Sequence, residues 1–400
     1  MLSEFNVKNS MKITFVISSL LGGGAERVVS NMATYWADKG WDITIFTLFH
    51  GSQPVCYDLH PKVRHLDLLN STHFNFPRPD AQSALALREL FDILTPSERK
   101  EFLRDITLIV AMRHAIKRTL PDLVISFLDA TNIRVLIATH GLNFPVVVSE
   151  RSDPRQISTG REGWDRLRHR LYPRANGVVL LDEESLSYFS PDVQARCRVI
   201  PNPAFPTAVS AAKEETARDG KKTLLAMGRL DTEKGFDFLL QAFSRVAPRQ
   251  PAWSLDIWGQ GPLRATLEAL ANDLNLGDRV RFRGFTQHPI RVMQRADLFV
   301  MASRFEGFPN VLLEAMACGL PVVTFNCPTG PGKIIRHGID GVLVPPSDVG
   351  ALIATLDRMM GDEAERKRLA GKAPEVIERF SVERVMGMWE DLIRGLESNG

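Results

Sequence analysis

Hydrophobic residues in the first half of the chain alternate between strand-like runs and helix-like spacing. Lys12–Ser18 and Asp42–Leu48 are rich in β-branched residues, which predicts two buried strands. Between them, Ala25–Lys39 carries apolar residues at helical spacing, and Gly40 is placed to end that helix. This alternation indicates a parallel sheet with helices on both faces. Further strands are predicted at Leu123–Phe127, Val146–Ser149 and Gly177–Leu181.

One segment of this half predicts a long helix. Thr95 is a suitable N-cap, Pro96 favours the first helical position, and Glu98 completes a capping box. The helix is expected to continue to Thr119, and another helix is expected over Asp80–Leu94.

The pattern starts again after a polar stretch. Residues 201–203 are rich in proline, and residues 207–221 have the small, polar and charged composition of a linker. Helices are expected to end near Val246 and to cover Arg264–Leu274. The sequence therefore predicts an α/β protein of two doubly wound halves, joined near 206–220. The strands of the second half are predicted at Thr223–Met227, Ser254–Ile257, Val280–Arg283, Leu298–Ala302 and Val322–Phe325.

Composition adds few constraints. The chain has 400 residues, which exceeds what one hydrophobic core usually organises, and its net charge of +2 gives no indication of a nucleic-acid partner. No apolar run approaches the roughly 20 residues of a membrane span. Lys12 and the apolar run after it could be read as a secretory signal, but a strand followed by a glycine turn fits better.

The histidines and cysteines give no sign of a metal site, and none is expected. Four widely spaced cysteines are expected to be reduced, buried thiols: Cys56, Cys197, Cys318 and Cys327.

The strongest chemical signal is a pair of glutamates in a predicted strand–loop–helix. Glu306 follows the strand at 298–302, whereas Glu314 lies just over one turn into a helix that Asn310 is expected to cap. Both carboxylates should therefore lie at the carboxyl edge of the sheet, where open α/β sheets bind ligands. Carboxylates are good acceptors for sugar and ribose hydroxyls. The alternative is two solvated surface charges.

A second signal lies in the loop after the first strand of the second half. Arg229 and Lys234 stand in a glycine-flanked strand-to-helix loop that begins at Gly228, where both cations can reach one pyrophosphate. Surface salt bridges to Asp231 and Glu233 are the alternative interpretation.

A third signal is the triple glycine Gly22, Gly23 and Gly24, between the first strand and the first helix. Glycine lets a backbone approach a ligand closely, and the N-terminus of the following helix favours anions. An ordinary turn is the alternative.

Together these motifs resemble those of retaining glycosyltransferases of family 4, which have the GT-B fold of two facing Rossmann-like domains with a cleft between them. The resemblance implies that Glu306 contacts the transferred sugar and Glu314 the nucleotide ribose. It implies that Arg229 and Lys234 bind the donor diphosphate, so that Arg229, Lys234 and Glu306 are the expected catalytic residues. Further donor-binding residues are expected at Gly22, Gly23, Gly24, Gly228, Phe285, Phe308 and Asn310.

The resemblance covers nearly the whole chain from Met11 and implies a domain organisation. We expect a flexible extension at 1–10, an acceptor-binding domain at 11–205 and a nucleotide-sugar-binding domain at 206–379. A final helix at 380–400 is expected to cross back onto the first domain.

Two positions depart from the family pattern. Many relatives carry a histidine after the strand that here ends at Phe127, and this chain has none. Asp129, Asn132 or a backbone group is expected to serve the sugar or acceptor in its place. Lys333 replaces a glutamate of the family, and either meets a phosphate or is solvated.

The segment 148–154 is similar to bacterial enzymes that build lipid-linked glycans and surface polysaccharides. Asp129, Glu150 and Arg151 are therefore expected to bind the acceptor. Residues 151–174 hold seven arginines against three acidic residues, which indicates a solvated basic face, a site for an acceptor phosphate or contact with an anionic membrane surface. The residues expected at such a membrane are Arg166, Arg168, Arg170 and Arg174.

The resemblance implies a retaining, metal-independent hexosyltransferase that needs no cofactor and uses a nucleotide diphosphate sugar, with uridine as the favoured base. The acceptor is expected to be a glycolipid or a polyprenyl-diphosphate-linked saccharide. The protein is expected to be cytoplasmic and peripherally bound to the inner face of the cell membrane. A non-catalytic partner subunit is one alternative, because of the missing histidine and Lys333. An NAD-dependent oxidoreductase is another, but the chain lacks the full Gly-x-Gly-x-x-Gly and an acidic residue after the second strand.

Overall fold

The computed structural model describes residues 10–51, 54–69, 80–155, 162–206 and 220–397. The chain divides into two compact units. Unit 1 combines Met1–Pro201 with Met386–Gly400, and unit 2 is Asn202–Val385. The N-terminal extension expected before Met11 and the linker expected between the two halves lie almost entirely outside the described residues.

Unit 1 is built on a parallel seven-stranded sheet with the order β3-β2-β1-β4-β5-β6-β7. Because all the strands run in the same direction, their carboxyl ends lie at one edge of the sheet. The strands are β1 (Lys12–Ile17), β2 (Asp42–Thr47), β3 (Arg64–Asp67), β4 (Leu123–Phe127), β5 (Val146–Ser149), β6 (Gly177–Leu180) and β7 (Cys197–Val199).

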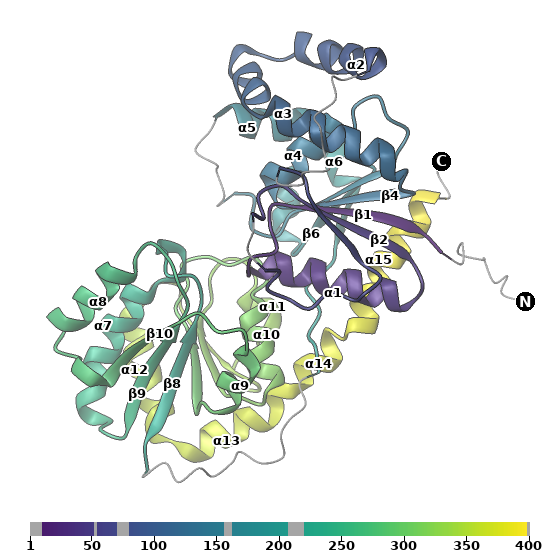
Figure 1. Cartoon of the computed structure of the whole chain (residues 1–400). Coiled ribbons are helices and arrows are strands. Elements are labelled where there is room, and N and C mark those ends of the chain that lie inside the picture. Colours follow the sequence, from purple (N-terminus) through teal and green to yellow (C-terminus); the bar gives the residue numbers. More distant parts are fainter. Residues whose placement is uncertain (1–9, 52–53, 70–79, 156–161, 207–219, 398–400) are drawn as a thin grey trace, which may run out of the picture. The chain divides into compact units, whose positions relative to one another are not determined.

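Helices cover both faces of this sheet (Figure 1). They are α1 (Gly24–Asp38), α2 (Ala81–Asp92), α3 (Pro96–Thr119), α4 (Asp129–Ala138), α5 (Glu162–Leu171), α6 (Pro191–Gln194) and most of α15 (Val382–Glu397).

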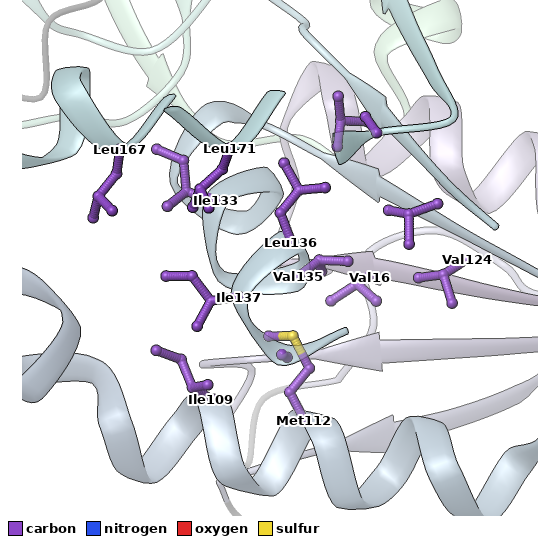
Figure 2. Packing of buried hydrophobic residues seen from close by; sticks show 14 of the residues in the cluster. Val16, Ile109, Met112, Val124, Ile133, Val135, Leu136, Ile137, Leu167 and Leu171 are labelled. Carbon is purple, nitrogen blue, oxygen red and sulfur yellow. The ribbon is translucent and has the colours of Figure 1, made fainter. Parts of the chain in front are cut away.

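The apolar residues of α4 explain how the helices pack on one face of the sheet. Figure 2 shows Ile137 turned toward Ile109 of α3, and Val135 turned toward Val16 and Val124 of the strands. All five of these side chains are fully buried. Eight of the ten residues of α4 are buried, so the helix is covered on several sides and lies between the sheet and α3.

Aromatic side chains pack on the other face of the sheet. Phe15 of β1 stacks on Trp36 of α1 with ring centroids 5.8 Å apart, and Phe127 of β4 lies 6.2 Å from Trp389 of α15. Trp389 is 1% exposed, so the last helix supplies part of the core of unit 1.

Unit 2 has a parallel six-stranded sheet with the order β10-β9-β8-β11-β12-β13. Its strands are β8 (Lys222–Met227), β9 (Trp253–Trp258), β10 (Val280–Gly284), β11 (Leu298–Met301), β12 (Val322–Phe325) and β13 (Val342–Val344). Its helices are α7 (Phe236–Val246), α8 (Arg264–Asp273), α9 (Pro289–Gln294), α10 (Asn310–Ala317), α11 (Pro331–Ile334), α12 (Val349–Gly361), α13 (Glu363–Lys372) and α14 (Val376–Arg379).

The structure confirms the predicted strands and helices to within one or two residues at their ends, apart from the final helix, which was predicted over 380–400 and is described over Val382–Glu397. α3 has the predicted capping box of Thr95 and Glu98. The cap prediction at Asn310 is wrong, because Pro309 has the extended conformation that precedes the helix and Asn310 is already its first residue. The short strands β3, β7 and β13 were not predicted. Within the described part of the chain, no helix combines the length and hydropathy that a membrane span requires.

Candidate active site

Two loops of unit 2 meet at the carboxyl edge of its sheet. One follows β8 and leads through a 3-10 turn, Thr232–Lys234, into α7; the other follows β11 and leads into α10. Since β8 and β11 are parallel neighbours in the sheet, both loops leave the same edge side by side. These loops carry Arg229, Lys234 and Glu306.

The central contact between the loops is an ion pair of Lys234 and Glu306. Lys234 Nζ lies 2.7 Å from Glu306 Oε1, and Ser303 Oγ donates to the same oxygen at 2.7 Å. The side chain of Glu306 is 9% exposed and that of Lys234 is 24% exposed. Burial by itself lowers the pKa of Lys234, but the Glu306 carboxylate outweighs this, and the pKa lies above its ordinary value of 10.5. Lys234 therefore remains an ammonium ion at neutral pH.

Gly235 allows this close approach of the two loops. It has a φ of 61°, and a Cβ added there would lie only 2.0 Å from the Ala302 carbonyl oxygen. A larger residue would therefore push the β11 loop away from Lys234.

Arg304 clamps the β11 loop onto the start of α7. Its guanidinium donates two hydrogen bonds to the Asp237 carboxylate, at 2.8 and 2.7 Å. Its Nη1 also donates to the Thr232 carbonyl oxygen at 2.8 Å, and its backbone N–H donates to the Glu233 carbonyl oxygen at 2.8 Å. Bidentate pairing of this kind fixes geometry as well as charge. Arg304 was not among the predicted residues, although a basic residue two positions before Glu306 was an available signal.

Arg229 has a different environment from Lys234. Its guanidinium forms an ion pair with Asp231 and lies 3.5 Å from Glu233, with 65% of the side chain exposed. The salt bridges considered as an alternative from the sequence are therefore present. A diphosphate at this position has to draw Arg229 away from these carboxylates, so the role of Arg229 stays a prediction.

The remaining donor-binding predictions fall into two groups. Glu314 and Asn310 lie half-buried on α10, and Phe285 is exposed after β10. Phe308, in contrast, is 5% exposed and packs edge-to-face on Phe380 with centroids 5.2 Å apart. Its ring therefore supports the β11 loop from inside unit 2.

Gly22 and Gly23 lie in the loop between β1 and α1, and Gly24 is the first residue of α1. Gly23 is the residue before the helix, and a Cβ added there would lie 2.2 Å from Glu26 Oε2. Glu26 thus folds back over the N-terminus of α1, where Ser19 Oγ donates to its Oε1 at 3.3 Å. A carboxylate at this end of a helix takes the place of an external anion, so a phosphate that binds Gly22–Gly24 has to compete with Glu26.

The predicted acceptor residues of unit 1 belong to a buried ionic cluster. Arg168 lies 3.1 Å from Asp129 Oδ2 and 3.6 Å from Glu150 Oε1, and the Tyr172 hydroxyl donates to Glu150. Burial raises the pKa of Glu150, and Arg168 counteracts this effect. The contacts with Arg168 and Tyr172 hold the Glu150 carboxylate inside unit 1. An acceptor contact by Asp129 or Glu150 stays a prediction.

Arg151 lies next to this cluster. It is 9% exposed, donates to Ser149 Oγ at 3.2 Å, and its guanidinium lies 5.5 Å from the centroid of the Phe127 ring. Burial lowers the pKa of Arg151 to about 9. The residue therefore holds its charge at neutral pH in an environment that favours any negative group that reaches it.

The expected basic surface at 151–174 needs correction. Arg168 is 1% exposed, so it cannot contact a membrane, and Arg170 pairs with the buried Glu98 at 3.0 Å. Arg166 and Arg174 are exposed. Arg155, Arg168 and Arg170 pair with buried carboxylates of unit 1. Sequence spacing does not show which arginines turn inward.

Comparisons with known proteins extend over both units. The family model described as glycosyl transferase 4-like domain matches residues 23–203, and the model described as glycosyl transferases group 1 matches residues 210–376. An exopolysaccharide phosphotransferase of Streptomyces coelicolor is 31% identical over 97% of this chain, but the chain spans only 41% of the length of that relative.

A second relative matches from end to end. It is the GalNAc-α-(1→4)-GalNAc-α-(1→3)-diNAcBac-PP-undecaprenol α-1,4-N-acetyl-D-galactosaminyltransferase of Campylobacter jejuni, 28% identical over 96% of this chain and 98% of the relative. Among solved structures, Anabaena HepE in complex with UDP-glucose superposes with a TM-score of 0.74 at 21% identity, covering 97% of this chain and 100% of that one. TarM of S. aureus superposes with a TM-score of 0.76 at 14% identity, covering 96% and 99%. At these identities the structures establish the GT-B fold alone.

Proposed function

Since the chain belongs to the retaining group 1 glycosyltransferases of family 4, we propose that it moves a sugar from a uridine diphosphate sugar to a polyprenyl-diphosphate-linked saccharide. The Lys234–Glu306 pair is the observation that carries this proposal. It places a permanent cation and a carboxylate 2.7 Å apart on adjoining loops, at the edge of the sheet where α/β proteins bind ligands.

Lys234 and Glu306 suit the two sides of the bond that breaks, the diphosphate and the sugar. As the bond between the sugar C1 and the diphosphate oxygen lengthens, negative charge grows on the leaving phosphate, and the Lys234 ammonium stabilises it. Glu306 accepts hydrogen bonds from the sugar hydroxyls and so holds the sugar in place. The acceptor hydroxyl forms the new bond to C1 from the face that the phosphate leaves, and its proton passes to the leaving phosphate. This sequence retains the configuration at C1 and needs no nucleophile from the enzyme.

The proposed donor and the proposed acceptor are each supported by a different similar protein. Anabaena HepE was solved in complex with UDP-glucose, which supports a uridine diphosphate sugar. The Campylobacter relative is named for a saccharide linked to diphospho-undecaprenol, which supports an acceptor on a lipid diphosphate. Such an acceptor lies in a membrane, so we propose that the protein works at the inner face of the cell membrane.

A donor screen tests this function. The protein is incubated with uridine, guanosine and adenosine diphosphate sugars and a short polyprenyl-diphosphate saccharide, and release of the nucleoside diphosphate is measured. We expect release with a uridine donor, and NMR of the product should show the anomeric configuration of the donor. Lys234→Ala is the matched inactive control. If the protein neither transfers sugar nor slowly hydrolyses any donor, the proposal fails and the protein is the non-catalytic subunit considered above. If it transfers a phosphorylated sugar, it is a phosphotransferase and the proposal also fails.

A further inference from the structure

A cavity of about 1280 Å³ opens at the amino edge of the unit 1 sheet. Its lining includes Val146 at the start of β5, Asn176 just before β6 and Arg196 just before β7. Glu150 and Arg151 follow β5 at the opposite, carboxyl edge. The cavity therefore lies at the opposite edge of this sheet from Glu150 and Arg151, which are expected to bind the acceptor.

One wall of the cavity is apolar and incompletely covered. Leu142 and Phe144 come from the loop after α4, Val199 comes from β7, and Met388 and Leu396 come from α15. All five side chains are half-buried. Met388 and Leu396 are two turns apart on one face of α15, so the wall continues along the helix. Apolar surface that remains in contact with water favours a ligand with hydrocarbon groups.

The cavity also carries positive charge without a matching negative charge. Arg174, Arg196 and Arg198 line it, and among the described residues no carboxylate lies within ion-pair distance of any of the three. The hydrogen bonds of these arginines go to neutral acceptors: the His140 ring at 2.9 Å, the Ala175 carbonyl at 3.2 Å and the Cys197 carbonyl at 2.8 Å.

The lining contains one acidic residue, and it does not balance these arginines. Asp391 of α15 pairs with Arg394, three positions further along the same helix. The guanidinium groups of the cavity therefore keep N–H donors for an external anion, and arginine suits phosphate oxygens because it can bind two of them at once.

We propose that this cavity binds a membrane phospholipid with an anionic head group, its phosphate on the three arginines and an acyl chain along the apolar wall. A soluble phosphate compound would leave that wall in water, and a neutral lipid would leave the arginine charges uncompensated. The cavity is thus a lipid-binding site at the far edge of the sheet from the proposed acceptor residues, and its occupation does not depend on the sugar donor.

Calorimetry with a monomeric lipid tests the proposal. Dihexanoyl phosphatidylglycerol below its critical micelle concentration is titrated into the full chain, so that no charged membrane surface contributes. We expect saturable binding. The zwitterionic dihexanoyl phosphatidylcholine, with the same chains, and glycerol 3-phosphate, without chains, should each bind at least about tenfold more weakly, the discrimination expected when one of two binding elements is absent.

Two sets of substitutions locate the binding. Arg174→Gln, Arg196→Gln and Arg198→Gln together should abolish binding of phosphatidylglycerol, and Leu396→Ser should weaken it. Replacement of Lys100, Arg104 and Arg118 by Gln removes the same charge from exposed positions of α3 and should leave binding unchanged. Donor hydrolysis should stay the same in every variant, which separates this site from the proposed function. Absence of binding in the unaltered protein, equal loss in both triple variants, or glycerol 3-phosphate binding as tightly as the lipid would overturn the proposal.

Discussion

Lys234 Nζ lies 2.7 Å from Glu306 Oε1, so the two charges expected to act on the donor form an ion pair with each other. In the proposed complex the donor inserts between these two side chains, with its diphosphate on the lysine and its sugar on the glutamate. The ion pair keeps both side chains in one orientation before the substrate arrives, which reduces the reorganisation that the transition state requires.

Lys234→Ala is expected to lower turnover by roughly 10²–10³, because one preorganised charge opposite the leaving phosphate is lost. The rate of nucleoside diphosphate release at saturating donor measures this. Lys234→Arg keeps the charge and should retain part of the rate. Near-normal turnover of the alanine variant, with an unchanged circular dichroism spectrum, would remove Lys234 from the diphosphate site.

Glu306→Gln should reduce transfer more than it reduces affinity for the free nucleoside diphosphate, since the residue is assigned to the sugar. The substitution keeps the shape of the side chain and a hydrogen bond with Ser303, and removes the charge opposite Lys234. Steady-state rates and calorimetry with uridine diphosphate give the two quantities. If both fall by the same factor, Glu306 supports the nucleotide and not the sugar.

Glu314→Ala should reduce affinity for the free nucleoside diphosphate more than it reduces the rate of transfer. A charged hydrogen bond to the ribose contributes roughly 1.5–3 kcal/mol, so affinity for uridine diphosphate should fall by about ten- to a hundredfold. Glu378→Ala, at an exposed position of α14, is the matched control. Calorimetry with the nucleotide alone is sufficient, and an unchanged dissociation constant would contradict the ribose assignment.

Arg304→Ala is expected to slow turnover by about tenfold or more, although Arg304 has no assigned contact with the donor. Loss of the clamp on Asp237 lets the β11 loop move away from Lys234, and misplacement of about 1 Å can cost 10²-fold in rate. Affinity for uridine diphosphate should change much less than kcat. Arg304→Lys, which keeps the charge without the bidentate contact, should be nearly as slow; full activity of the lysine variant would show that charge alone is needed.

Arg168→Leu is expected to lower the free energy of unfolding by about 3–5 kcal/mol, because it leaves Glu150 and Asp129 without their cation. The loss should depend on pH. Glu150 has a pKa above its ordinary value of 4.5, and removal of Arg168 raises it further. Stability is therefore lost as the pH rises through this raised pKa, and the variant should be closer to the unaltered protein at pH 5 than at pH 8. Urea unfolding at the two pH values measures the difference, and a loss independent of pH would contradict it.

The sequence was informative where the determinants were local. The capping box of Thr95 and Glu98 marks the start of α3, and the strands Leu123–Phe127 and Val146–Ser149 are continuous apolar runs with clear ends. β7 and β13 have only three residues each and owe their pairing to a neighbouring strand, so no periodicity identifies them.

The ion-pair partners of the charged residues could not be predicted from the sequence. Arg304 meets Asp237, which is 67 positions away, and Arg168 meets Asp129 and Glu150 from separate elements. Arg168 was consequently expected at the surface, in a segment whose charge composition indicates a basic face. Tertiary packing decides which arginines are buried, and composition does not predict which ones these are.

The last helix has a consequence for synthesis on the ribosome. Unit 1 is discontinuous in the sequence, since Met386–Gly400 belongs to it while the whole of unit 2 is translated in between. Until Trp389 emerges, Phe127 lacks its aromatic neighbour, and Trp36 lacks the Glu390 carboxylate that accepts its indole N–H at 3.2 Å. The nascent unit 1 therefore exposes part of its core while unit 2 is made and can already fold. Unit 2 is therefore expected to reach its native state before unit 1 does.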